Sequence, residues 1–360
     1  MAGRIGNVQI GCGDGPAYQR EGGALAALYG ELLGMVRYDP GYIKLRPEGT
    51  QPDGGLEIGF ENGDDVRPRW PDPDHPQQVH LDIEVADVDK AGAIGERHGA
   101  VLLRDGAGPH RVYADSVGHP FCLDPGGDGP AGRISCVVFD CPDPSALARF
   151  YEDLLDLRTR VLDTVDRVEI AGDRPGAPSL AFQRSPGPPP QWPDPSRPAQ
   201  LHLDLVFDDG PAAAALLRRL GAPRIGALPL HSVWADPAGH PFCGPASGYV
   251  TVRDLPPGVT SVWDFPPDWK GGNLPLTQAE IVAGLRQVAP DIEFVDARHG
   301  HLTRPGLELA ISIGGADPPK SVVISFDDAE RSTVDPVIRP LLDGLGLGAF
   351  DADAPGRIFT

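Results

Sequence analysis

Two short segments of the chain carry the same acid and base at the same spacing. His80 and Asp82 stand two residues apart in VHLDIEV, and His202 and Asp204 stand two apart in LHLDLVF. Both segments alternate apolar and polar residues, which is typical of a half-buried strand, so each histidine should share a face with its aspartate. A neighbouring carboxylate raises the pKa of an imidazole and gives it acid–base capacity. The alternative is that each pair only satisfies its own hydrogen bonds.

Other residues with binding chemistry recur around these two segments. Trp70 and Trp192 precede them in Pro-Asp-Pro loops, where an indole either stacks on a planar ligand or packs as part of the core. His110 and His231 open a later strand candidate in each case, and we expect them to line the mouth of a cavity. These four side chains, with the two His and Asp pairs, are the candidate ligand-binding residues.

The recurrence is part of an internal duplication. Residues 69–85 read RWPDPDHPQQVHLDIEV, and residues 191–207 read QWPDPSRPAQLHLDLVF. A second pair of segments, HRVYADSVGHPFC and HSVWADPAGHPFC, follows these, and NVQIGC at the front corresponds to CVVFDC. The two copies therefore cover residues 1–126 and 131–246, joined by the Gly-rich segment GGDGPAG.

Each copy predicts the same order of elements. In the second copy, the strand ISCVVFDC precedes a helix with Asp143 as its N-cap, three short strands, and a further strand, helix and three strands. This order, with the HLD and GHPFC motifs, resembles the vicinal oxygen chelate superfamily, above all its glyoxalase-like and bleomycin-resistance-like members. The resemblance covers about residues 5–246 and implies an α+β fold class, with two tandem βαβββ-βαβββ half-barrel domains whose concave faces hold the ligand.

The resemblance also implies positions for a metal ion, at the first, fifth and eighth strands, where the usual ligands are His or Gln, His, and Glu. The matching residues are Asn7, His80 and Cys122 in the first copy and Cys136, His202 and Cys243 in the second. Cys in place of Glu favours zinc or copper(I). The second copy would offer a Cys₂His set with one position left for water, whereas Asn7 makes the first copy a poorer site. The alternative is that these cysteines are small core residues.

The last third of the chain matches no family pattern. Residues 247–275 are rich in Pro, Gly and Trp and predict a linker, although their first part could add a strand. Residues 276–360 predict a small α+β domain that opens with a helix, for which Thr277 is the N-cap and Glu280 completes a capping box. This domain could mediate association, cover a cleft or bind a partner.

Composition excludes several classes of function. Acidic residues outnumber basic ones 51 to 31, which gives a formal charge of −20 and disfavours nucleic acid and anionic lipid as partners. We find no signal peptide and no apolar stretch of membrane-spanning length. Five cysteines, an odd number, fit reduced thiols in a cytoplasmic protein. Because the duplication could replace a second subunit, the expected state is a monomer or a homodimer.

Two functions from different classes follow. The first is a small-molecule-binding protein that holds or sequesters an aromatic or cationic compound, as the missing Glu and the acidic charge favour. The alternative is a metal-dependent lyase, isomerase or dioxygenase that uses the second copy, with a divalent ion, zinc being most compatible, as its cofactor. A third reading leaves ligand binding to the C-terminal domain. No catalytic residue is assigned from the sequence.

Overall fold

The computed structural model describes most of the chain, which forms two compact units. Residues outside the description are 1–2, 14, 39–42, 51–55, 63–66, 71, 73–76, 106–109, 128, 175, 186, 188–189, 191–198, 208–209, 229–230, 246, 253–271, 295, 315–316, 320, 327–330, 352–357 and 360. The first unit contains residues 1–208, 216–225 and 234–243. The second contains residues 209–215, 226–233 and 244–360.

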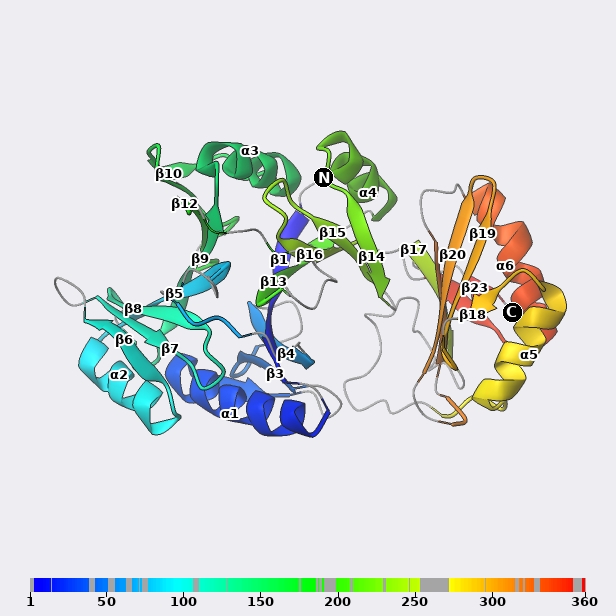
Figure 1. Ribbon diagram of the computed structural model, residues 1–360, viewed down its shortest axis with the longest axis horizontal. Coiled ribbons are helices and arrows are strands. Elements are labelled where there is room, and N and C mark those ends of the chain that lie inside the picture. Colours follow the sequence, from blue (N-terminus) through cyan, green and yellow to red (C-terminus); the bar gives the residue numbers. More distant parts are fainter. Residues whose placement is uncertain are drawn as a thin grey trace. The chain divides into compact units, whose positions relative to one another are not determined.

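Four modules, each a strand, a helix and three strands, precede the C-terminal sheet (Figure 1). The first contains β1 (Gly3–Cys12), α1 (Gly15–Leu33), β2 (Met35–Arg37), β3 (Ile43–Pro47) and β4 (Glu57–Asn62). The second contains β5 (Val79–Val85), α2 (Val88–Arg97), β6 (Val101–Asp105), β7 (Arg111–Ala114) and β8 (Pro120–Pro125). The third contains β9 (Arg133–Cys141), α3 (Pro144–Leu155), β10 (Arg160–Asp163), β11 (Arg167–Ile170) and β12 (Ser179–Arg184). The fourth contains β13 (Leu201–Phe207), α4 (Gly210–Arg219), β14 (Arg224–Leu228), β15 (His231–Ala235) and β16 (Pro241–Gly244).

The modules form two sheets, and each sheet takes one module from each copy of the duplication. Over the described residues, sheet A has the order β14-β15-β16-β13-β1-β4-β3-β2, and sheet B has the order β10-β11-β12-β9-β5-β8-β7-β6. β1 pairs antiparallel with β13, and β5 pairs antiparallel with β9. The duplication and the α+β fold of βαβββ modules are confirmed. The two modules of each copy lie in different sheets.

The lengths of the connections account for this pairing. β8 and β9 are joined by residues 126–132, whereas residues 63–78 separate β4 from β5 and residues 185–200 separate β12 from β13. Modules joined by a short connection tend to become neighbours in space. The second and third modules therefore share sheet B, and the longer connections cross between the sheets.

Each copy nevertheless keeps its own hydrophobic core. In the first copy, the ring of Tyr29 on α1 packs against Phe60 and Phe121. In the second copy, the ring of Tyr151 on α3 packs against Phe139 and Phe182. α1 also contacts α2, the other helix of its copy (Figure 1). A copy is thus a packing unit even though each sheet runs through both copies.

Equivalent residues of the two copies meet at Gln78 and Gln200. The backbone N–H of Gln78 donates to the side-chain oxygen of Gln200 at 3.0 Å, and the N–H of Gln200 donates to the side-chain oxygen of Gln78 at 3.2 Å. A reciprocal contact between equivalent residues is what a local twofold axis produces. His80 on β5 and His202 on β13 each stand two residues after one of these glutamines.

The alternation of side chains along each strand determines which of them face the core and which lie on the opposite face of the sheet. Leu201 and Leu203 of β13 are fully buried core residues, so His202 and Asp204 lie on the opposite face of sheet A. The same alternation places the His and Asp of β5 on one face of sheet B. We call these two surfaces the histidine faces of the sheets.

A buried turn that follows the same plan in both copies fixes β16 and β8. The carboxylate of Asp236 accepts hydrogen bonds from the N–H groups of Ala238 and His240, both at 2.9 Å, and from the Tyr151 hydroxyl at 3.2 Å. It also lies 2.9 Å from Nδ1 of His240. Burial alone would lower the pKa of His240, but the charge of Asp236 outweighs burial and raises it. Asp115 holds the matching turn of the first copy.

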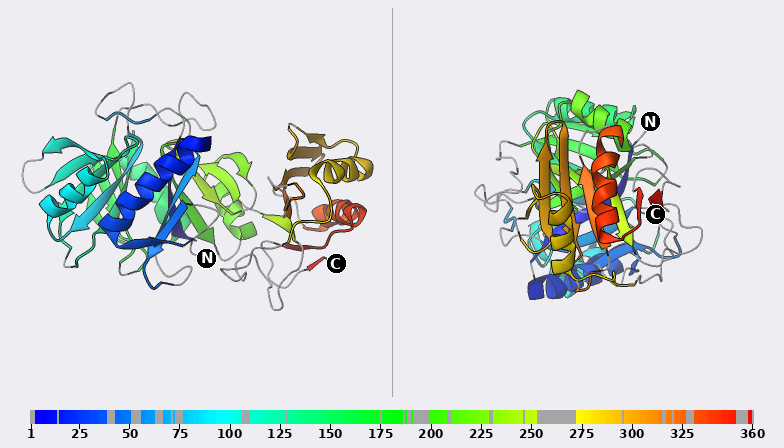
Figure 2. Two further views of the ribbon diagram at one scale, coloured as in Figure 1. Left: turned by 90° about the horizontal axis from the view of Figure 1, so that it is seen from below. Right: turned by 90° about the vertical axis from the view of Figure 1, so that its right-hand side faces the viewer.

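The C-terminal unit carries a sheet of its own, and Figure 2 shows α5 and α6 side by side over one face of it. Among the described residues its strand order is β18-β19-β20-β21-β17-β22-β23. Its elements are β17 (Ser247–Val252), α5 (Gln278–Val288), β18 (Glu293–Phe294), β19 (His299–Arg304), β20 (Leu307–Ile313), β21 (Ser321–Phe326), α6 (Arg331–Leu345), β22 (Ala349–Asp351) and β23 (Ile358–Phe359). The capping box of Thr277 and Glu280 is confirmed. No helix in the described part of the chain is long and apolar enough to cross a membrane.

The first part of residues 247–275 forms a strand, as the sequence allowed. This strand, β17, lies within the C-terminal sheet, paired with β21 and β22. The C-terminal sheet therefore begins at Ser247. The remainder of the expected linker, residues 253–271, falls outside the described residues.

We expect Asp236→Asn to destabilise the protein by about 3 kcal/mol, because it removes the charge that stabilises a buried imidazolium. The raised folded pKa of His240 makes this contribution complete below the unfolded value of about 6.5, and the contribution fades as the pH rises through the folded value. Urea unfolding at about pH 6 and about pH 9 measures the difference. Asp166→Asn, at an exposed position, is the control. A loss of equal size at both pH values would contradict a charged pair.

Candidate functional site

His202, Asp204 and Cys243 form a compact group on the histidine face of sheet A, which we call cluster A. Nε2 of His202 lies 3.4 Å from Oδ1 of Asp204 and 3.5 Å from Sγ of Cys243. One ligand atom from each residue lies within 4.8 Å of the others. β13 supplies the histidine and the aspartate, and β16 runs parallel beside it with Cys243 opposite Asp204.

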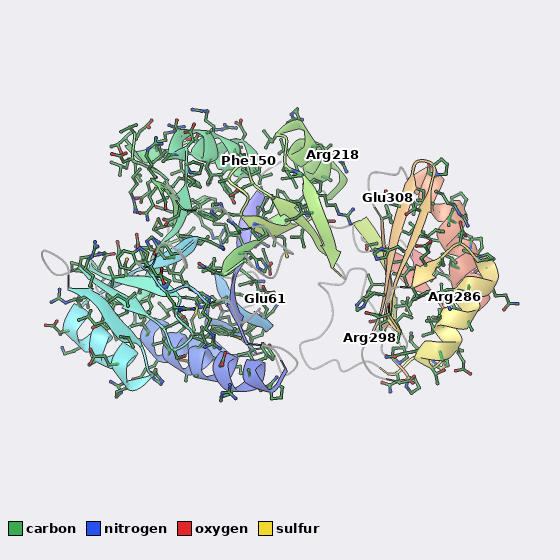
Figure 3. The ribbon with its side chains drawn as sticks, in the orientation of Figure 1. Glu61, Phe150, Arg218, Arg286, Arg298 and Glu308 are labelled. Atoms are coloured by element: carbon green, nitrogen blue, oxygen red, sulfur yellow. The ribbon has the colours of Figure 1, made fainter. Side chains whose placement is uncertain are left out.

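Three further side chains orient cluster A. The carboxylate of Glu61, at the end of β4 (Figure 3), lies 3.1 Å from Nδ1 of His202. The side-chain amides of Gln9 and Asn7 on β1 both donate to Oδ2 of Asp204, at 2.7 and 3.1 Å. These contacts fix the orientation of the His202 ring and of the Asp204 carboxylate.

The charges of cluster A are strongly coupled. Burial alone would lower the pKa of His202, but the charge of Glu61 and the contacts with Cys243 and Asp204 raise it well above its ordinary value. Burial alone would raise the pKa of Asp204, but the contacts with His202, Gln9 and Asn7 hold it well below its usual range. Burial raises the pKa of the Cys243 thiol. The free cluster is thus an imidazolium between two carboxylates, beside a neutral thiol.

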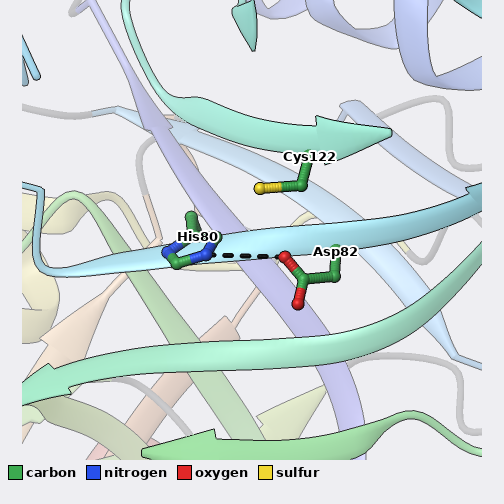
Figure 4. Close-up of side chains that lie close together, drawn as sticks. All are labelled: His80, Asp82 and Cys122. Carbon is green, nitrogen blue, oxygen red and sulfur yellow. Dashed lines mark ion pairs between the residues drawn. The ribbon is translucent and has the colours of Figure 1, made fainter. Parts of the chain in front are cut away.

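The matching residues of sheet B, His80, Asp82 and Cys122, form cluster B (Figure 4). Nε2 of His80 lies 3.5 Å from Oδ1 of Asp82, and the three ligand atoms again lie within 4.8 Å of one another. Asp82 stands opposite Cys122 on the parallel strand β8 and opposite Cys136 on the antiparallel strand β9. The same three residue types therefore occur at the same strand positions in both sheets.

A basic side chain lies against cluster B. The guanidinium of Arg167, on β11, is 3.3 Å from Oδ2 of Asp82 and 3.5 Å from the carboxylate of Glu169. Burial alone would raise the pKa of Asp82, but His80 and Arg167 hold it below its usual range. Cluster B therefore contains an ionised carboxylate that a cation of the protein already neutralises.

Nδ1 of His80 also has different surroundings from Nδ1 of His202. In sheet B, Asp140 of β9 pairs with Gln183 of β12. In sheet A, the matching pair is Gly11 of β1 and Glu61 of β4. An amide in sheet B therefore takes the position that a carboxylate has in sheet A. The amide of Gln183 donates to Asp140 at 2.6 Å, and burial raises the pKa of that carboxyl. Nδ1 of His80 is buried and has no hydrogen-bond partner among the described residues.

The Cys₂His triple predicted from the sequence is not brought together. Cys136 lies on β9 in sheet B, opposite Asp82, whereas His202 and Cys243 lie in sheet A. The first strand of the second copy pairs with the fifth strand of the first copy, and this exchange separates the three residues. Asp204 takes the third position beside His202 and Cys243.

The remaining candidate residues lie outside both clusters or outside the description. His110 stands before β7, and its Nδ1 lies 2.6 Å from a carboxylate on β8. The guanidinium of Arg104 lies over the ring of Trp70, 5.0 Å from its centroid. Trp192 and the side chain of His231 fall outside the described residues. Ligand binding by these four residues stays a prediction.

Gln9 and Glu61 were missed by the sequence reasoning. Gln9 follows Asn7 by two residues in a strand, so alternation alone places both on one face and could have indicated it. A Cβ atom on Gly59 would lie 2.0 Å from Oε1 of Gln9, so this glycine provides the space for the glutamine side chain. Glu61 has no such signal, because its position depends on the pairing of β4 with β1.

Comparison with known proteins agrees with this architecture. The family model described as a glyoxalase-like domain matches residues 18–123 and 136–244, more than half of the chain. The chain therefore belongs to the glyoxalase-like domain family, within the vicinal oxygen chelate superfamily. No curated protein matches the chain.

Solved structures with a similar fold include enzymes and a binding protein. A variant of glyoxalase I from Zea mays is 15% identical, with 67% of this chain and 93% of that chain covered and a TM-score of 0.47. The 2,2',3-trihydroxybiphenyl 1,2-dioxygenase of Sphingomonas wittichii is 16% identical, with 68% and 90% covered and a TM-score of 0.24. An antibiotic binding protein from Streptomyces is 16% identical, with 34% and 96% covered and a TM-score of 0.23. These likenesses concern the fold alone.

We expect Glu61→Gln to lower the pKa of His202 in metal-free protein, because the substitution removes a carboxylate that stabilises the imidazolium. A titration of the histidine ring followed by NMR measures the change. Glu57→Gln, on the same strand β4, is the matched control and should leave the titration of His202 unaltered. An unchanged pKa in Glu61→Gln would show that this ion pair does not form.

Proposed function

We propose that the chain binds a divalent transition-metal ion, zinc by the chemistry of its ligands, at cluster A. The spacing of the ligand atoms carries this proposal. Bonds of about 2.0–2.3 Å in a tetrahedral zinc site place neighbouring ligand atoms about 3.3–3.7 Å apart. The two separations from Nε2 of His202, 3.4 and 3.5 Å, fall in this range. The N–O distance exceeds the roughly 2.7–2.9 Å of a charge-assisted hydrogen bond, so a shared ion fits the group better.

Glu61 supports the same assignment. Histidines that bind a metal usually donate their other ring N–H to a carboxylate, which fixes the ring and leaves one nitrogen free as the ligand. Glu61 is placed for this contact at Nδ1, and Nε2 faces Asp204 and Cys243. Asp204 is already ionised, so binding would release protons from His202 and Cys243 only.

The ligand set also narrows the reaction class. Zinc bound by three protein residues would polarise an oxygen atom of a small ligand as a Lewis acid, and zinc does not change its oxidation state. A zinc site therefore favours a lyase or an isomerase over a dioxygenase. The side chain of Glu61 is 42% exposed, so it is the carboxylate placed to take up a proton beside the ion.

The second candidate is the binding of a small organic cation without a metal, and the charge of cluster A favours it. With His202 protonated, the carboxylates of Glu61 and Asp204 leave cluster A and its outer carboxylate with a net negative charge. The chain as a whole carries a formal charge of −20, which adds to the attraction for a cation. Such a ligand would compete with a metal ion for the same two carboxylates.

The metal proposal predicts one zinc ion per chain in wild-type protein, measured by elemental analysis after dialysis. His202→Ala should contain none, because it removes the central ligand of cluster A. His80→Ala, the matched change in cluster B, should keep the ion. Zinc should also raise the midpoint of thermal unfolding of the wild type, by binding only the folded state. Equal metal content in the two variants would contradict the assignment to cluster A.

The second candidate predicts that metal-free protein binds an aromatic quaternary ammonium ion such as benzyltrimethylammonium. Isothermal titration calorimetry should give an affinity that falls about tenfold in Glu61→Gln, a change of about 1.4 kcal/mol. Prior addition of zinc should abolish the binding. The absence of binding at millimolar concentration would remove this candidate and leave the metal proposal as it stands.

A further inference from the structure

Clusters A and B offer the same three ligand types, yet a fixed positive charge lies against cluster B. The guanidinium of Arg167 lies 3.3 Å from Oδ2 of Asp82, and Oδ1 of the same carboxylate faces His80 at 3.5 Å. The side chain of Arg167 is only 29% exposed, so solvent screens its charge weakly. A divalent ion held by the other oxygen of Asp82 would be repelled by this guanidinium at short range.

The surroundings of Nδ1 in the two histidines also favour metal binding at cluster A over cluster B. In cluster A, the carboxylate of Glu61 holds Nδ1 of His202, which leaves Nε2 free as a ligand atom. In cluster B, Gln183 occupies the matching register position and donates to Asp140 instead. Nδ1 of His80 is buried without a partner among the described residues. In the described part of the chain, Nδ1 of His80 therefore lacks the carboxylate contact that orients metal-binding histidines.

β3 in sheet A and β11 in sheet B occupy matching positions, and their sequences differ at the position of Arg167. Ile43 pairs with Phe60 in sheet A as Val168 pairs with Phe182 in sheet B. The residue before Val168 is Arg167, whereas the residue before Ile43 is a tyrosine, which lies outside the described residues. In the sequence, a tyrosine therefore stands at the position that matches Arg167, and the nearest basic residue of β3, Lys44, pairs with Gly59 instead.

We propose that Arg167 supplies at cluster B the positive charge that a metal ion supplies at cluster A, and that Arg167 thereby restricts metal binding to one of the two equivalent clusters. This inference rests on the proposed function of cluster A. Arg167 is a specificity-determining residue: it neutralises the carboxylate of Asp82 and excludes a second cation. Duplicated ligand sets that began alike have become one metal site and one site with a permanent internal cation.

The test is a count of zinc ions per chain after dialysis against zinc, by elemental analysis and by calorimetric titration. Wild-type protein should bind one ion. Arg167→Met combined with Gln183→Glu should bind two, because the pair removes the cation and restores the outer carboxylate. Adding Cys122→Ser to that double variant should return the count to one, which places the second ion at cluster B. Arg167→Lys keeps the charge and should bind one.

Two results would overturn the inference. One is a count of two in the wild type and in Arg167→Lys, and the other is a double variant that binds no more zinc than the wild type. Circular dichroism checks that each variant folds. If Arg167→Met does not fold, Arg167→Gln replaces it, because glutamine is uncharged but keeps a hydrogen-bond donor for Asp82. Wild-type protein without zinc would reject the proposed function alone, provided that the double variant gains an ion that Cys122→Ser removes. Without such a gain, both proposals fail.

Discussion

The antiparallel pairing of β1 with β13, and of β5 with β9, determines which strands of the other copy lie beside the His and Asp of the two clusters. Because β1 runs beside β13, the amides of Asn7 and Gln9 reach Asp204. A slip of one residue in β13 would turn His202 and Asp204 into the core and move Leu201, Leu203 and Leu205 to the opposite face. The buried leucines of β13 therefore fix the register on which the chemistry of cluster A depends.

The same scaffold, built twice, gives two sites with different charge. His, Asp and Cys recur at matching positions, and the buried Asp–His–Tyr turns that hold β8 and β16 recur as well. The differences lie in the neighbours: Glu61 beside His202 in sheet A, and Arg167 beside Asp82 in sheet B. Neither neighbour changes the fold, so the duplicated scaffold places one cluster beside a carboxylate and the other beside a guanidinium.

The local features of this architecture follow from the sequence, and the non-local ones do not. Three predictions depend only on residues a few positions apart, and all three agree with the structure. They are the N-caps Asp143 and Thr277 and the shared face of His80 and Asp82. The partner of each module depends on pairing between strands far apart in sequence, which periodicity does not encode. For that reason the sequence placed Cys136 beside His202, and it gave no indication of Arg167.

X-ray absorption spectroscopy of the zinc-loaded wild-type protein at the zinc edge tests the central claim most directly, because it reports the atoms bound to the ion. Coordination at cluster A predicts one sulfur neighbour at about 2.3 Å with nitrogen and oxygen neighbours at about 2.0–2.2 Å. The sulfur neighbour should disappear in Cys243→Ser and persist in Cys122→Ser. A zinc ion with no sulfur neighbour in the wild type, or one that loses it in Cys122→Ser, would contradict the account.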